Sequence, residues 1–110
     1  MKQYVVDELR PGDYQKVKAH LDGSFPAGSI DGVYWIPIAE NLLSPDQAAH
    51  TECHPLCFAV DLEPERLICE LLLRTQQRLR CSCIGYATEA QRNWIIQVID
   101  GIFRKLDIKT

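Results

Sequence analysis

The chain has 110 residues, of which 46% are hydrophobic and 25% charged, a composition that is typical of globular domains and argues against disorder. Its formal net charge of −3 provides no general attraction to nucleic acids or anionic membranes, so we expect neither as a partner. At this length we expect residues 1–110 to form a single domain.

The start of the chain and its cysteine count favour a cytoplasmic protein. Acidic side chains stand among the first eight residues, where a secretory signal peptide needs an apolar stretch. The five cysteines are an odd number, unlike the even framework of a disulfide-stapled secreted domain. We therefore expect a cytoplasmic location and reduced thiols.

The first half of the chain predicts two strands and two helices. Residues 2–9 contain a cluster of strand formers, and residues 11–23 begin with proline and repeat apolar side chains at helical spacing. A second strand is expected over residues 33–37. Residues 44–50 begin with a Ser-Pro-Asp-Gln capping box, which predicts a short helix.

The next part of the chain predicts a meander of three antiparallel strands, at residues 56–63, 67–74 and 78–83, because apolar side chains alternate along each. Aligning the apolar faces gives one register. In that register the neighbours are Val60, Cys69 and Cys83, then Phe58, Leu71 and Cys81, then Leu56, Leu73 and Leu79. Leu71 is then at the centre of the apolar face, and Cys69, Cys81 and Cys83 point into the core.

A second capping box at residues 88–91 predicts a long C-terminal helix. Its apolar stripe consists of Trp94, Val98, Ile102 and Leu106, flanked by Ile95, Ile99 and Phe103. The apolar face of the meander is the only large partner for this stripe, and we expect the N-terminal helix to cover the other face. The predicted fold class is therefore α+β, an antiparallel β-meander sheet packed against helices in a two-layer sandwich.

One segment carries a possible metal site, formed by His50, Cys53, His54 and Cys57. Imidazole and thiolate are ligands that zinc prefers, and this spacing lies within the range that zinc sites use. Cys81 and Cys83 are not included, because two residues on one face of a flat strand lie about 6.6 Å apart along it and would need a bend to chelate together.

The cysteines also fit the alternative interpretation that they are small buried hydrophobic side chains, which requires no cofactor. A third interpretation is a thiol-dependent enzyme, in which His50 lowers the pKa of Cys53 one helical turn away. No oxyanion hole or orienting third group accompanies that pair. We expect a thiol reagent to modify Cys53 or Cys57 first, because Cys69, Cys81 and Cys83 are predicted to point into the core and burial shields thiols from reagents.

Arginines form a second candidate site. In the predicted register Arg74, Arg78 and Arg80 share the outer face of the meander, where like charges are unfavourable unless an anion or an acidic partner surface neutralises them. A solvated face paired with nearby acidic residues is the alternative.

The sequence therefore leaves three hypotheses for function. The first is a small, non-catalytic binding or regulatory domain, with a protein partner or as a homodimer. The second is a zinc-binding domain that uses the segment from His50 to Cys57, and the third is the thiol-dependent enzyme.

Overall fold

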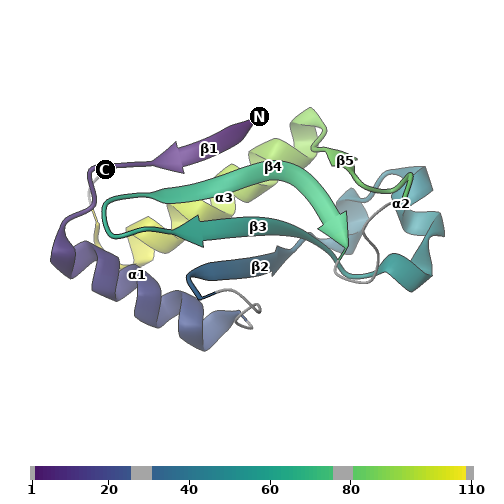
Figure 1. Cartoon of the computed structure of the whole chain (residues 1–110). Coiled ribbons are helices and arrows are strands. Elements are labelled where there is room, and N and C mark those ends of the chain that lie inside the picture. Colours follow the sequence, from purple (N-terminus) through teal and green to yellow (C-terminus); the bar gives the residue numbers. More distant parts are fainter. Residues whose placement is uncertain (1, 26–30, 76–80, 109–110) are drawn as a thin grey trace.

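The computed structural model describes residues 2–25, 31–75 and 81–108. Within these residues an antiparallel sheet of five strands packs against helices, which confirms the predicted α+β class (Figure 1). The strands are β1 (Gln3–Val6), β2 (Val33–Pro37), β3 (Leu56–Leu62), β4 (Leu67–Thr75) and β5 (Gly85–Tyr86). The helices are α1 (Pro11–Ser24), α2 (Pro45–Ala49) and α3 (Glu89–Lys105), with 3-10 helices η1 (Glu40–Leu42) and η2 (Thr51–Cys53) on either side of α2.

Both predicted capping boxes start the helices that they predict. The Ser44 hydroxyl accepts a hydrogen bond from the Gln47 backbone N–H at 3.2 Å, and the Gln47 side chain accepts one from the Ser44 N–H at 3.0 Å. Thr88 and Gln91 make the same reciprocal pair at the start of α3. These bonds satisfy backbone donors that a helix start otherwise leaves free.

The strand order in the sheet is β1-β4-β3-β2, and β5 pairs with β4 as well. Val60 lies opposite Cys69, as predicted. The two other predicted rows are wrong. The register between β3 and β4 shifts between Phe58 and Val60, so that Phe58 lies opposite Leu73 and not opposite Leu71.

Leu71 lies in this part of β4 and bonds on the edge of the strand away from β3. Its N–H donates to the Lys2 carbonyl, and its carbonyl accepts from the Ala87 N–H. A bulge of this kind adds residues to one strand and bends it. Leu71 keeps 8% of its surface exposed whereas Leu73 is fully buried, so Leu73 takes the central place that the sequence predicted for Leu71.

The third predicted strand is also wrong over its described part. Residues 81–84 form a turn closed by a hydrogen bond of 3.0 Å from the Ile84 N–H to the Cys81 carbonyl, and β5 follows it. Cys83 is therefore not beside Cys69, whose neighbours are Tyr4 and Val60. Residues 78–80 lie outside the described part of the chain.

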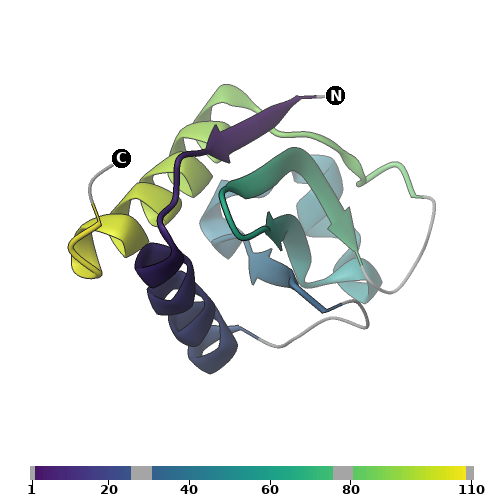
Figure 2. The same ribbon diagram turned by 60° about the vertical axis from the view of Figure 1, so that its left-hand side comes forward.

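The helices α1 and α3 cover the same face of the sheet (Figure 2). Tyr34 of β2 donates to Asp22 of α1, and Tyr4 of β1 donates to Asp100 of α3. Both tyrosines share a face with the Val60–Cys69 row, because they pair directly with Val60 and Cys69. The expectation that the N-terminal helix covers the opposite face is therefore wrong.

The inner surface of α3 is shifted by one residue from the predicted stripe. Its buried side chains are Gln91, Ile95, Ile99 and Phe103. The sequence predicts the last three as the flank of the apolar stripe and does not include Gln91. Trp94 is half-buried and its ring stacks on Phe58 of β3 with a centroid distance of 6.4 Å. No helix in the described ranges is long and apolar enough to cross a membrane.

Candidate metal centre

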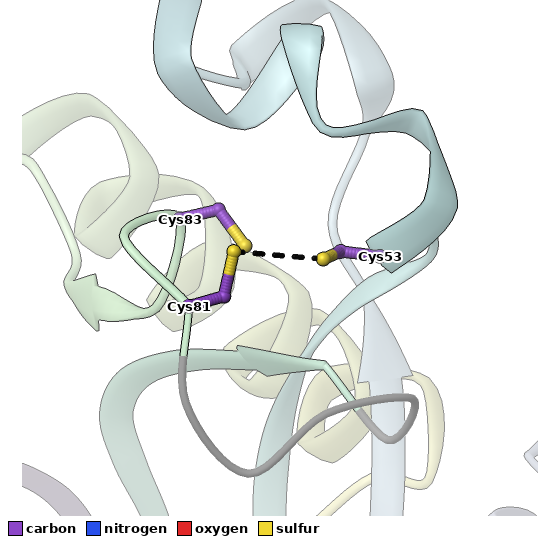
Figure 3. Close-up of side chains that lie close together, drawn as sticks. All are labelled: Cys53, Cys81 and Cys83. Carbon is purple, nitrogen blue, oxygen red and sulfur yellow. Dashed lines mark hydrogen bonds between the residues drawn. The ribbon is translucent and has the colours of Figure 1, made fainter.

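Three cysteines from two separate segments meet at the end of the sheet that carries α2 and β5 (Figures 1 and 3). The sulfur atoms of Cys53, Cys81 and Cys83 all lie within 4.8 Å of one another. The Cys53 and Cys81 sulfurs are 3.7 Å apart. Tetrahedral zinc with Zn–S bonds of about 2.3 Å requires sulfurs about 3.8 Å apart, so the arrangement is close to that of a zinc site.

The turn at residues 81–84 explains how Cys81 and Cys83 come together. On a flat strand their side chains would be about 6.6 Å apart along the chain. The hydrogen bond from Ile84 to Cys81 closes the chain into a turn, and both sulfurs then lie on the side that faces Cys53 (Figure 3). The bend that chelation by this pair needs is therefore present in the backbone.

Cys53 is placed by the short helices that precede it. It ends η2, where its backbone N–H donates to the His50 carbonyl at 3.0 Å. The helix α2 comes directly before η2, and its capping residue Gln47 donates from Nε2 to the Cys83 carbonyl at 3.1 Å. One side chain thus ties the segment that carries Cys53 to the turn that carries Cys83.

A second buried glutamine extends this connection to the long helix. Gln91 of α3 donates from Nε2 to the Gln47 side-chain oxygen at 2.9 Å and to the Leu42 carbonyl at 2.8 Å. Both glutamines are buried. Buried amides that are fully hydrogen-bonded hold the elements that they join in one arrangement. The two capping boxes therefore also position the cysteine cluster.

No protein-family model, curated protein or solved structure matches this chain.

The structure separates the four predicted metal ligands. Cys53 belongs to the cluster, whereas Cys57 is buried on β3 with its sulfur 3.7 Å from the Pro55 carbonyl. His54 bonds through Nε2 to the Gln47 carbonyl at 2.8 Å. His50 bonds through Nδ1 to the Asp46 carbonyl at 2.6 Å and interacts electrostatically with Cys81.

Sequence reasoning missed Cys81 and Cys83 as partners of Cys53. Their alternation with Ser82 predicts a strand that points both side chains into the core. Cys83 is buried as expected, but Cys81 is only half-buried. A signal for the turn was available, because serine inside the segment and Gly85 directly after it are typical of turns.

The three thiols of the cluster have different acidities. The backbone N–H of Cys83 donates to the Cys81 sulfur and, with side-chain hydrogen bonds from Cys83 and Cys53, lowers the pKa of Cys81 to about 7. Burial raises the pKa of Cys83 to about 12 and also raises that of Cys53. Negative charge in the metal-free cluster is thus concentrated on Cys81.

This difference predicts the order of thiol modification in the reduced, metal-free protein, and it reverses the order expected from the sequence. Cys53 and Cys57 are buried, and burial raises the pKa of Cys57 to about 11. Alkylation of Cys81 by iodoacetamide should be the fastest, because the thiolate is the nucleophile. Since the pKa of Cys81 is lowered to about 7, its rate should rise as the pH approaches that value and level off above it.

Peptide mass spectrometry between about pH 5 and pH 9 measures the rate at each cysteine. Cys57 is the internal control and should react slowly over the whole range. A Cys81 rate no higher than that of Cys57 at neutral pH would contradict this prediction.

The predicted arginine face is only partly described. Arg74 on β4 donates from Nε to Glu70 at 2.8 Å, so its charge already has an acidic partner on the same strand. Arg78 and Arg80 lie outside the described residues. The anion or partner site at these arginines stays a prediction.

Proposed function

We propose that the protein is a non-catalytic metal-binding domain in which Cys53, Cys81 and Cys83 bind one zinc ion. The observation that carries this proposal is the spacing of the three sulfurs, all within 4.8 Å of one another. Such spacing leaves room for one ion at the centre. The segments that supply these ligands are 28 residues apart in the sequence, so bound metal would join two distant parts of the chain.

The ligand type favours zinc among the metals of the cell. Thiolates are soft ligands that select zinc, copper(I) or iron–sulfur clusters. Iron–sulfur clusters are held as a rule by four cysteines. The two further cysteines, Cys57 and Cys69, lie on strands β3 and β4 and do not belong to the cluster of three sulfurs. Zinc accepts a mixed set of three thiolates and one imidazole, which this end of the molecule can supply.

A structural role is supported by how firmly the ligands are held. Cys53 and Cys83 are buried, and Gln47 connects their two segments. Structural zinc sites contribute directly to the stability of the fold. A zinc ion here would fix η2 against the turn at residues 81–84.

The test is a zinc titration of the reduced protein against a chromophoric chelator. The unmodified chain should bind one zinc ion, and Cys53→Ser should lower the affinity more than about 100-fold, because losing a ligand costs more than losing a supporting hydrogen bond. Cys57→Ala is the matched control, since it removes a buried thiol outside the cluster.

Two results would overturn the proposal. The first is that the unmodified chain binds no zinc. If protein isolated from cells then also carries a disulfide between Cys53 and Cys81, the thiol-dependent enzyme is favoured. The second is equal zinc affinity in Cys53→Ser and in Cys57→Ala. The cytoplasmic location, the protein partner or homodimer, and the lack of nucleic-acid and membrane partners stay predictions.

A further inference from the structure

Three thiolates leave one position of a tetrahedral zinc ion unfilled, and the nature of the fourth ligand decides what the site is for. Structural zinc sites are closed by four protein ligands, whereas catalytic sites keep one position for water or substrate. His50 and His54 flank Cys53 in the sequence and are the two candidates for the fourth ligand.

We propose that His50 is the fourth ligand and binds the metal through Nε2, which makes the centre a closed site of three cysteines and one histidine. This inference rests on the proposed function. The observation behind it is the hydrogen bond of 2.6 Å between His50 Nδ1 and the Asp46 carbonyl.

That hydrogen bond fixes which nitrogen of His50 is free. A carbonyl oxygen only accepts, so Nδ1 must carry the proton, and in the neutral ring Nε2 then has the lone pair. The Asp46 carboxylate lies 3.4 Å from the same Nδ1. Metal-binding histidines as a rule donate their other ring N–H to a backbone carbonyl or a carboxylate, which orients the ring and raises its basicity. His50 has both kinds of partner.

His50 is also close to Cys53, because both belong to the same short turn. It lies three residues before Cys53 at the start of the 3-10 turn, and side chains three residues apart lie on the same side of such a turn. The ring is outside the group of atoms within 4.8 Å, so binding requires it to move closer to the sulfurs. A half-buried side chain at the edge of the site can do so.

His54 has the opposite arrangement and serves as the matched control. Its Nε2, the atom at the tip of the ring, bonds to the Gln47 carbonyl at 2.8 Å. The tip of this ring therefore points toward α2, and the nitrogen with the lone pair is Nδ1, beside the backbone. His54 follows Cys53 directly in the sequence, so substitutions at His50 and His54 disturb the same short segment.

Cobalt(II) substitution tests the inference, because charge-transfer absorption reports the number of thiolates on the metal and the visible bands report its coordination. His50→Ala should weaken cobalt binding about 10- to 100-fold or more and alter the visible bands, and added imidazole should restore them. His50→Cys should keep the metal and increase the charge-transfer absorption from that of three thiolates to that of four. His54→Ala and His54→Cys should leave affinity and spectrum unchanged.

The outcomes separate this inference from the proposed function. If the unmodified chain with cobalt shows no thiolate charge transfer, the three-cysteine site itself is wrong. If it does, but His50→Cys adds no thiolate band and His50→Ala keeps its spectrum, only the assignment of His50 fails and the fourth position is open. A thiolate band added by His54→Cys instead would assign the position to His54. Weaker binding by His50→Ala without imidazole rescue, together with an unchanged His50→Cys spectrum, would mean that His50 only supports the fold of η2.

Discussion

Replacing Phe58 by alanine is expected to lower the free energy of unfolding by about 3–5 kcal/mol, the usual cost of removing a large aromatic side chain from a core. Phe58 is fully buried on β3, lies opposite Leu73 and stacks on Trp94 of α3. It therefore contributes to the contact between the sheet and the long helix, and alanine would leave a cavity there.

Urea denaturation followed by circular dichroism measures this loss. Leu72→Ala is the control, because Leu72 is only half-buried, on the face of the sheet opposite to Leu73, and should cost less. A loss for Phe58→Ala below about 1 kcal/mol, the typical effect of an average substitution, would mean that α3 does not pack on this part of the sheet.

Zinc should stabilise the reduced protein strongly. At a free zinc concentration about 1,000 times the dissociation constant, binding to the folded state alone adds about 4 kcal/mol to the free energy of unfolding. Thermal unfolding with zinc and with excess chelator measures the difference. The physical reason is that the metal joins η2 to the turn at residues 81–84. These two segments are brought together only in the folded chain, where Gln47 bonds to the Cys83 carbonyl.

Cys83→Ser should reduce this gain to about 1.4 kcal/mol or less, because losing one ligand lowers the affinity about 100-fold or more, whereas Cys57→Ala should keep the full gain. Equal melting temperatures with zinc and with chelator for the unmodified chain would contradict the prediction. So would a zinc-dependent increase in Cys83→Ser that equals the increase in the unmodified chain.

The elements that sequence analysis predicted correctly are those with local signals. The helix starts at Ser44 and Thr88 depend on side chains that bond to backbone groups three residues away, so the sequence contains the whole interaction. The strands at residues 56–62 and 67–75 follow from alternation, which needs only the residues of each strand.

The register failed where it depended on more than one strand. Val60 and Cys69 pair as predicted, but the register shifts between Phe58 and Val60. On the edge of β4 away from β3, Leu71 bonds to Lys2, next to β1, and to Ala87, next to β5. The pairing of β4 with β3 on one edge and with β1 and β5 on the other brings together segments far apart in the sequence, so the β4 residues alone do not reveal the irregularity.

Of the three clustered cysteines the sequence predicts only Cys53 as a ligand, for a similar reason. Cys53 was recognised because histidines stand beside it, and a ligand set within one segment can be found from spacing. Cys81 and Cys83 join it through a tertiary contact between segments 28 residues apart. The alternation with Ser82 predicts a strand in which both cysteines point into the core. In the structure the hydrogen bond from Ile84 to Cys81 makes this segment a turn, and both sulfurs face Cys53.

X-ray absorption spectroscopy of the zinc-loaded protein reports which atoms bind the metal and therefore tests the proposed centre directly. We expect three sulfurs at about 2.3 Å and one imidazole nitrogen at about 2.0–2.1 Å. Cys81→Ser should reduce the sulfur count by one. Oxygen and nitrogen atoms around the zinc, without sulfur, would show that Cys53, Cys81 and Cys83 do not bind the metal.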